Sequence, residues 1–257
     1  MKKFINLLFR ISKRFKKKEI IEKISKISSN RVLMGLYKSV VLDTNSKFSG
    51  DLPSKLLGIY EEPVQQKILE ITKKKKFKYL INFGAADGYH AIGLVKKKIF
   101  KKALAFEIDK DIRERLKNNM IKNKVSSKIT ILGKASFADI SKIIKSKNLK
   151  DCFYLVDIEG DEFNLFNKDN LKYFKNSFLL IENHVNLYKP PKKQVANFFK
   201  LLENNFNILR IKQNEKNPFI IKSLDDFDED MKWLAMSECR PTNQDWIFCS
   251  PKNIKKM

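Results

Sequence analysis

Residues 79–88 read Tyr79-Leu-Ile-Asn-Phe-Gly-Ala-Ala-Asp-Gly88, an apolar strand that runs into a turn of small residues and then into a helix. A second apolar strand follows at Ala105-Phe-Glu107-Ile-Asp109 and ends in a carboxylate. Glycines at 84 and 88 let the backbone turn tightly and come close to a ligand, and the start of the next helix offers unpaired N–H groups. A carboxylate at the end of the second strand can accept hydrogen bonds from ribose hydroxyls. The two stretches together predict a nucleoside site.

Two ligands fit this spacing, a dinucleotide and S-adenosylmethionine. A dinucleotide-binding turn has the pattern Gly-x-Gly-x-x-Gly, in which the middle glycine lets the pyrophosphate approach the backbone. Ala86 stands where that middle glycine would be, so the turn favours S-adenosylmethionine. A turn of this kind also occurs in α/β proteins that bind no nucleoside, and it is the carboxylate of Glu107 that favours a binding site here.

The composition is that of a globular chain with a strong basic excess. At 257 residues the chain can bury a full core, most simply as one α/β domain with an N-terminal extension, with two small domains as the alternative. The formal net charge is +24, but the lysines are scattered through every segment, whereas a nucleic-acid surface is a concentrated basic patch. We expect no membrane-spanning segment and no secretory signal. Cys152, Cys239 and Cys249 lie far apart, which indicates a reducing, cytoplasmic compartment and no structural zinc site.

Residues 2–27 predict a basic amphipathic helix. Apolar side chains recur at three- and four-residue steps, opposite a face rich in lysine and arginine. The apolar set is Phe4, Leu7, Leu8, Ile11 and Phe15. Such a helix can lie on an anionic membrane, here the inner face, through residues 1–26, or it can pack on the domain.

From residue 77 onward, apolar runs of strand length alternate with helical patterns. We predict strands at 78–83, 102–107, 128–132, 152–157, 178–183, 206–211 and 244–249. We predict helices at 63–72, 88–98, 109–122, 137–147, 161–174 and 191–204. This alternation predicts a mainly parallel sheet with helices on both faces and an antiparallel pair at the C-terminus. We therefore expect three parts, namely a helix at 1–30, a helical or irregular cap at 31–76, and an α/β domain at 77–257 with an insertion at about 212–243.

The fourth and fifth predicted strands end in dense polar sequences. The fourth runs into Tyr154-Leu-Val-Asp157-Ile-Glu159-Gly160-Asp-Glu162, and the fifth into Leu180-Ile-Glu182-Asn183-His184. Because ligands of an open parallel sheet bind beyond the carboxyl ends of its strands, these side chains should face the same crevice as Gly84 and Glu107. Glu162 also fits an ordinary acid in the first turn of a helix, where the helix dipole favours it.

The motifs at 82–88, 107–109, 157–162 and 182–184 occur in the order and spacing of FkbM-like S-adenosylmethionine-dependent methyltransferases. The Asp-x-Glu-Gly-x-Glu element is the distinguishing one, and the chain resembles this family over about residues 78–184. The resemblance implies a Rossmann-like class I methyltransferase fold, with a seven-stranded, mainly parallel sheet and an antiparallel last strand. Asn82 departs from the pattern, because many members have an aspartate whose charge would hold the ammonium group of the ligand.

The resemblance also implies how S-adenosylmethionine would be bound. The turn at 84–88 would pass along the methionine and ribose portions, and Glu107 would bind the ribose hydroxyls. Residues 135 and 136 would flank the adenine. The implied cofactor-binding residues are Asn82, Gly84, Ala85, Ala86, Asp87, Gly88, Glu107, Ile108, Ala135, Ser136 and Asp157.

Methyl transfer to a hydroxyl requires that the acceptor is aligned and that its proton is removed. His184 is the best base on intrinsic pKa, with Asp157 and Glu159 as rivals, and Glu182 completes the catalytic set. His184 can instead make a structural hydrogen bond to the loop. Asp157, Glu182 and Asn183 are also a possible Mg²⁺ set, but oxygen ligands on separate strand ends do not by themselves predict a metal, and we expect none.

We predict an S-adenosylmethionine-dependent methyltransferase that acts on an oxygen of a small molecule or glycan. We do not expect nucleic acid as the acceptor, because a nucleic-acid N-methyltransferase would present an Asn/Asp-Pro-Pro-Tyr turn where this chain has the acidic 157–162 segment. The alternatives are a nucleic-acid methyltransferase and a non-catalytic module that binds a membrane or polyanion on a degenerate methyltransferase fold. The turn disfavours an NAD-dependent oxidoreductase. The acceptor pocket would be built from the irregular segment 31–63 and the insertion 212–243. The sequences of these two segments do not indicate which acceptor is bound.

Overall fold

A computed structural model describes residues 2–44, 50–134, 152–238, 240, 242 and 244–253, the side chains of residues 2–10 excepted. The helix predicted at 137–147 and the candidates Ala135 and Ser136 lie outside the described residues. The chain divides into two compact units. One consists of Met1–Glu62 and Asn214–Arg240, and the other of Pro63–Gln213 and Pro241–Met257.

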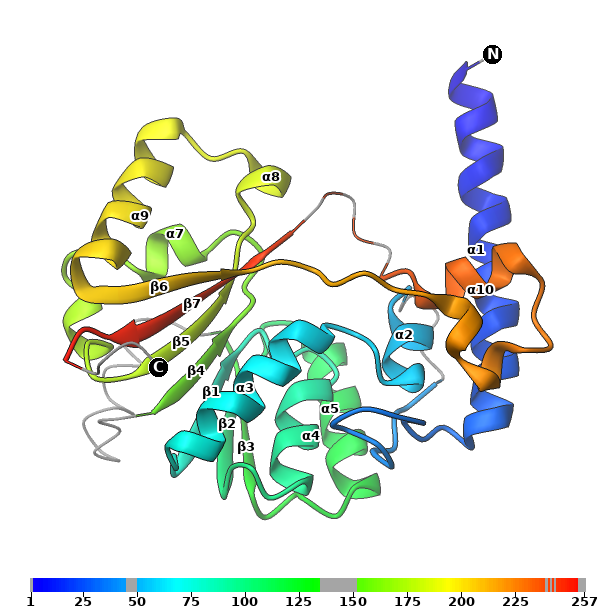
Figure 1. Cartoon of the computed structure of the whole chain (residues 1–257), viewed down its shortest axis with the longest axis horizontal. Coiled ribbons are helices and arrows are strands. Elements are labelled where there is room, and N and C mark those ends of the chain that lie inside the picture. The colour runs from blue at the N-terminus through cyan, green and yellow to red at the C-terminus, as the bar shows by residue number, and fades with distance from the viewer. Residues whose placement is uncertain are drawn as a thin grey trace. The chain divides into compact units, whose positions relative to one another are not determined.

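The second unit is built around one seven-stranded sheet (Figure 1). Its strands are β1 (Tyr79–Phe83), β2 (Lys102–Phe106), β3 (Ile129–Leu132), β4 (Phe153–Val156), β5 (Phe178–Glu182), β6 (Phe206–Ile211) and β7 (Trp246–Pro251). The order across the sheet is β3-β2-β1-β4-β5-β7-β6. β7 is antiparallel to β5 and β6, and the other neighbours are parallel. All seven predicted strands and the antiparallel last strand are confirmed.

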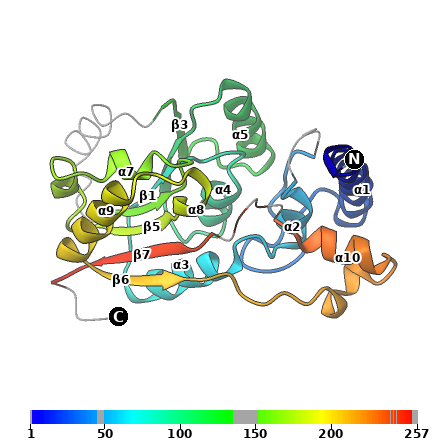
Figure 2. The ribbon, with the colours of Figure 1, turned by 90° about the horizontal axis from the view of Figure 1, so that it is seen from above.

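Helices cover both faces of this sheet. They are α3 (Glu62–Lys74), α4 (Tyr89–Lys96), α5 (Lys110–Lys122), α7 (Glu162–Leu165), α8 (Val185–Tyr188) and α9 (Lys192–Asn205), with a 3-10 turn η1 (Leu171–Tyr173). α4, α5 and α9 connect successive parallel strands, as predicted. Figures 1 and 2 show α7 and α9 on one side of the sheet and α3 and α4 on the other.

The prediction of one helix over 161–174 is wrong. The chain forms only the short α7 there and, after a break, η1. The side chain of Asn167 accepts the N–H groups of Asp169 and Asn170, at 3.0 and 3.1 Å. Asparagine and aspartate side chains of this kind compete with the backbone bonds of a helix, so the polar run at 167–170 ends it.

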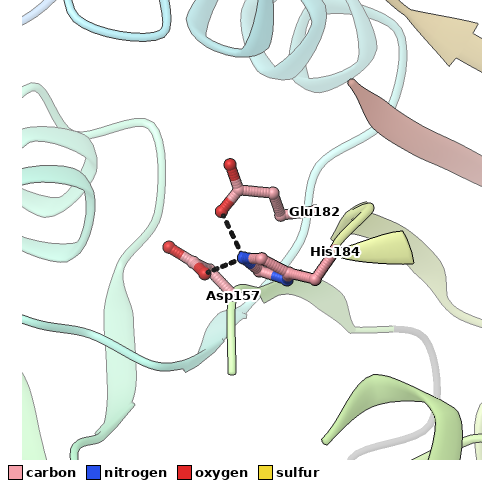
Figure 3. A group of neighbouring side chains, drawn as sticks. All are labelled: Asp157, Glu182 and His184. Atoms are coloured by element: carbon pink, nitrogen blue, oxygen red, sulfur yellow. Dashed lines mark ion pairs between the residues drawn. The ribbon is translucent and has the colours of Figure 1, made fainter. Parts of the chain in front are cut away.

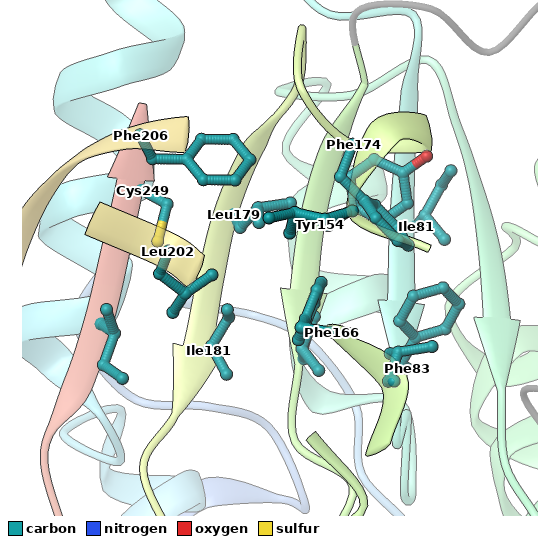
Figure 4. Close-up of a cluster of buried hydrophobic side chains, with 14 of the residues drawn as sticks. Ile81, Phe83, Tyr154, Phe166, Phe174, Leu179, Ile181, Leu202, Phe206 and Cys249 are labelled. Atoms are coloured by element: carbon teal, nitrogen blue, oxygen red, sulfur yellow. The ribbon is translucent and has the colours of Figure 1, made fainter. Parts of the chain in front are cut away.

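The core consists of alternate strand residues packed against the helices. On the side of α7 and α9, the cluster in Figure 4 includes Phe83, Tyr154 and Ile181 from three strands and Leu202 from α9. On the opposite side, Phe77 lies edge-on to Phe153 and Phe178, with ring centroids 5.5 and 5.2 Å apart. β4 and β5 are buried along their whole length, as expected for central strands that are covered on both faces.

The unit of Met1–Glu62 and Asn214–Arg240 is mainly helical. It contains α1 (Lys2–Ser28), α2 (Leu52–Leu57), α10 (Glu229–Met236) and the 3-10 turns η2 (Pro218–Ile220) and η3 (Lys222–Leu224). Ile20 and Ile24 of α1 are buried, and α1 packs against α2 and α10. Arg240 forms an ion pair with Glu61, which joins the two segments of the unit, and a second ion pair with Glu238. The predicted N-terminal helix is confirmed, and none of the described helices is long and apolar enough to cross a membrane.

Candidate functional site

The strand register brings four candidate residues to one level of the sheet. Phe83 of β1 is paired with Phe106 of β2 and with Val156 of β4. Val156 is in turn paired with Ile181 of β5. The residues that follow these four are Gly84, Glu107, Asp157 and Glu182. Because the four strands are parallel, these four residues lie along a single edge of the sheet, at its carboxyl end.

The turn after β1 is held close to both neighbouring strands. The N–H groups of Gly84 and Ala85 donate to the carbonyl of Phe106, at 2.9 and 2.8 Å. Gly84 has a φ of +75°, and a Cβ at this position would lie 1.5 Å from the carbonyl oxygen of Asp157. Ala86 also has a positive φ, +45°, which is unusual for alanine and is typical of backbone at functional turns. The neighbouring strands therefore dictate a glycine at position 84.

Asn82 and Asp87, two predicted cofactor contacts, make hydrogen bonds within the protein. Asn82 is 3% exposed, and its Nδ2 donates to the carbonyl of Leu155 at 3.4 Å. An aspartate could not make this bond, because an ionised carboxylate has no donor, so asparagine suits the position. The Oδ1 atom of Asp87 accepts the N–H of Tyr89 at 3.2 Å, at the start of α4. Contacts of these two residues with a ligand stay predictions.

Glu107 faces the glycine turn from the end of β2. Its side chain is buried, with Oε2 accepting the N–H of Ala86 at 3.0 Å and Oε1 accepting the N–H of Asp109 at 2.9 Å. A carboxylate has about four acceptor positions, so two bonds leave capacity for two more donors. Arg113 donates to the carbonyls of Glu107 and Ile108 at 2.8 and 2.7 Å, and the Ile108 side chain is 67% exposed beside the carboxylate.

His184 lies among the carboxylates at the carboxyl ends of β4 and β5 (Figure 3). Its Nε2 atom is 3.5 Å from Asp157 Oδ1 and 3.3 Å from Glu182 Oε2. Glu159 Oε2 lies 3.7 Å from the same nitrogen. The imidazole is 1% exposed, and its Nδ1 atom is 2.9 Å from Glu162 Oε1. The structure thus brings together all four residues of the predicted catalytic set.

The carboxylates change the acid–base behaviour of His184. Burial lowers the pKa of the imidazole, but the hydrogen bonds and charges of Glu162 and Glu182 outweigh this and raise the pKa to about 10. At neutral pH the ring is therefore an imidazolium, and it has no lone pair with which to accept a proton. The prediction of His184 as the base assumes the ordinary pKa of histidine, which these surroundings do not preserve.

Two further residues shape the cluster and are absent from the predicted catalytic set. Glu162, 1% exposed, accepts the N–H groups of Ile158 and Gly160 at 3.0 and 2.9 Å in addition to its bond with His184. Its place in the Asp-x-Glu-Gly-x-Glu element is the sequence signal that indicates it. Tyr188, on α8, donates its hydroxyl to Glu159 at 2.9 Å, and no sequence pattern indicates that pair.

Asn183, the third residue of the Mg²⁺ set considered from the sequence, makes a different contact. Its Nδ2 atom donates to Asp245 Oδ1 at 2.7 Å, just before β7 begins. Asn183 lies just beyond the last residue of β5, and this contact with the segment before β7 engages its side chain. Glu182 and His184 contact one another instead, at 3.3 Å.

No family model matches the chain, and no curated protein matches it either. Among solved structures, it is similar to an O-methyltransferase from Bacillus cereus in complex with S-adenosylhomocysteine, with a TM-score of 0.52, 9% identity and 90% of each chain covered. It is also similar to an rRNA methylase from Streptococcus thermophilus, with a TM-score of 0.49, 8% identity and coverage of 74% of this chain and 97% of that one. The O-methyltransferase TomG from Streptomyces achromogenes gives a TM-score of 0.47 at 13% identity, with 59% of this chain and 74% of that one covered. Together with the strand order, the Bacillus cereus structure shows that the sheet unit has the Rossmann-like fold of class I methyltransferases.

Proposed function

We propose that the protein is an S-adenosylmethionine-dependent methyltransferase, related to the FkbM-like enzymes, that methylates an oxygen of a small molecule or glycan. The observation that carries this proposal is Glu107, a buried carboxylate that two backbone N–H groups fix opposite a glycine turn. Its remaining acceptor capacity suits the two hydroxyls of a ribose. The Asp-x-Glu-Gly-x-Glu element at 157–162 supports the same class.

The residues at the carboxyl edge of the sheet fit this cofactor. The backbone of 84–88 would pass along the methionine portion, Glu107 would bind the ribose, and the exposed side chain of Ile108 would lie against the adenine. When bound, S-adenosylmethionine supplies a methyl group on a positively charged sulfonium. Carboxylates at the ends of β4 and β5 favour a positive charge at this edge.

The cluster around His184 would orient the acceptor and take its proton. Asp157 and Glu159 are its more exposed carboxylates, with side chains 29% and 66% accessible, so an acceptor hydroxyl can donate to either. The imidazolium of His184 offsets their charge. The same acidic surroundings repel a polyanion, which favours a neutral glycan or small molecule over nucleic acid.

Calorimetric titration of the full chain tests the proposal. We expect S-adenosylmethionine and S-adenosylhomocysteine to bind with one-to-one stoichiometry, and NADH, the matched control, not to bind. A folded protein that binds neither adenosyl compound would contradict the proposal. Binding of both compounds without methyl transfer to any hydroxyl acceptor in a panel of sugars would instead favour the non-catalytic alternative.

The N-terminal helix would bring the protein to an anionic membrane surface. Ile11 and Phe15 of α1 are 43% and 70% exposed, and Lys13, Arg14 and Lys18 are exposed around them. Apolar side chains among cations are the composition of an interfacial helix.

The double substitution Ile11→Ser and Phe15→Ser tests this contact without removing the buried residues of α1. Full burial of either side chain contributes about 1.5–3 kcal/mol. We therefore expect the variant to bind phosphatidylserine vesicles at least about tenfold more weakly, as measured by co-sedimentation. Phosphatidylcholine vesicles are the control for charge. Equal binding of the variant and the unaltered chain would exclude a role for this face.

A further inference from the structure

Three groups at the carboxyl edge of the sheet are arranged like the ligands of one metal ion. Asp157, Glu182 and His184 each offer one ligand atom, and these atoms lie within 4.8 Å of one another. Figure 3 shows Nε2 of His184 directed between the two carboxylates. Its distances to Asp157 Oδ1 and Glu182 Oε2 are 3.5 and 3.3 Å. Donors bound about 2.0–2.2 Å from one ion, at angles of about 90–110°, lie about 2.8–3.6 Å apart, so both distances from Nε2 fit a shared cation.

The surroundings of His184 fix which nitrogen is presented to this site. Glu162 Oε1 lies 2.9 Å from Nδ1, so the bond with this carboxylate keeps a proton on Nδ1 and directs Nε2 toward Asp157 and Glu182. A metal ion bound there takes the place of the Nε2 proton of the imidazolium. Glu162 is itself 1% exposed and is fixed by the N–H groups of Ile158 and Gly160. A carboxylate that orients the second nitrogen of a ligating histidine is the usual support of a metal site. This support is independent of the acidic ligands and distinguishes the cluster from a simple group of acids.

We propose that Asp157, Glu182 and His184 bind a divalent first-row transition ion of the Mn²⁺ or Fe²⁺ type. The imidazole ligand disfavours Mg²⁺ and Ca²⁺, which prefer oxygen ligands alone. A ligand set with two carboxylates also differs from the sulfur- and nitrogen-rich sets that bind structural zinc. Three protein ligands leave open positions on an ion that takes six, so a further oxygen donor can bind. Glu162 is a positioning residue in this site, and Asn183, engaged with Asp245, is outside it.

The ion gives the site a way to bind an acceptor with a hydroxyl beside a second oxygen, such as a vicinal diol. This part of the inference rests on the proposed function. The ion lowers the pKa of a bound hydroxyl, whose proton passes to Glu159 and then to water. The hydroxyl oxygen forms the new bond to the methyl carbon while the bond from sulfur to that carbon breaks, which leaves S-adenosylhomocysteine and a methyl ether. The sulfonium becomes a neutral thioether in this step, and its positive charge leaves the site with the hydroxyl proton.

Titration of the untagged full chain with Mn²⁺, followed by the loss of the free-ion paramagnetic resonance signal, tests the site. We expect one bound Mn²⁺ per chain and at least about tenfold weaker binding of Mg²⁺ in competition. Asp157→Asn keeps the shape of a half-exposed side chain, and we expect it to weaken Mn²⁺ binding by at least about tenfold. Glu159→Gln is the matched control, because it removes one charge 3.7 Å from the same Nε2 atom without removing a ligand, and we expect a loss below about threefold.

The titration separates the metal site from the proposed function when S-adenosylhomocysteine binding is measured on the same samples. No Mn²⁺ binding by the unaltered chain would overturn the metal site, and intact binding of S-adenosylhomocysteine would then leave the proposed function standing. Mn²⁺ binding without S-adenosylhomocysteine binding would support the site and contradict the cofactor. Equal losses in Asp157→Asn and Glu159→Gln would also overturn the site, because they would show general attraction by negative charge.

Discussion

Replacing Glu107 with alanine is expected to weaken the binding of S-adenosylhomocysteine by at least about 100-fold. Hydrogen bonds to a charged group contribute about 1.5–3 kcal/mol each, and the substitution removes the acceptor of two ribose hydroxyls. The carboxylate is also fixed by the N–H groups of Ala86 and Asp109, so it presents its free acceptor positions without losing side-chain freedom on binding. Isothermal titration calorimetry of the variant and the unaltered chain measures the difference.

The same two backbone bonds make a control necessary, since their loss lowers stability as well as affinity. Glu107→Gln retains one acceptor and the shape of the side chain, so we expect it to melt between Glu107→Ala and the unaltered chain and to bind with intermediate affinity. Glu114→Ala removes a glutamate from the exposed surface of α5 and should leave binding unchanged. If folded Glu107→Ala binds S-adenosylhomocysteine as tightly as Glu114→Ala does, the ribose does not lie at Glu107.

The sheet could be predicted from the sequence because its strands are short apolar runs separated by polar segments. β4 and β5, buried from end to end, are continuous apolar stretches, which is typical of central strands covered on both faces. The residues that follow the strands were predictable for the same reason. Once the parallel order is known, Gly84, Glu107 and Asp157 must lie on one edge.

The helix expected over 161–174 failed where side chains compete with the backbone. Apolar residues at 163, 166, 171 and 174 give a helical pattern, but they reach the core from a short helix and a 3-10 turn. The intervening Asn167 bonds the N–H groups of the residues that follow it. The spacing of apolar residues predicts which residues are buried, but here it does not predict the backbone conformation that places them in the core.

The contacts within the site depend on distances that no local pattern encodes. The bond between His184 and Glu162 joins the segments that follow β5 and β4. Asn183 donates to Asp245, which immediately precedes the last strand. The sequence predicts that His184 lies near these carboxylates. It does not show whether the imidazole has a typical pKa or is hydrogen-bonded to a buried glutamate. Only the folded chain shows that Nδ1 is engaged and that Nε2 faces Asp157 and Glu182.

Replacing Gly84 with alanine is expected to lower the free energy of unfolding by about 4 kcal/mol, as measured by urea denaturation. The new Cβ would lie 1.5 Å from the carbonyl oxygen of Asp157, in a backbone with a φ of +75°, so the ends of β1 and β4 must move apart. Gly133→Ala is the matched control, because a Cβ there meets nothing within 4 Å, and its stability should stay within about 1 kcal/mol of the unaltered chain.

The displacement caused by Gly84→Ala should also reach the binding site. The carbonyl that the methyl group displaces belongs to Asp157, whose side chain faces His184 at 3.5 Å, and the turn at 84–88 continues toward Glu107. We therefore expect the fraction of Gly84→Ala that remains folded at low temperature to bind S-adenosylhomocysteine at least about tenfold more weakly, since a displacement of about 1 Å at a positioned site has effects of this size. A variant that is as stable as Gly133→Ala would show that β1 and β4 are not in contact at this level, and the shared edge on which Glu107, Asp157 and His184 meet would then have to be built differently.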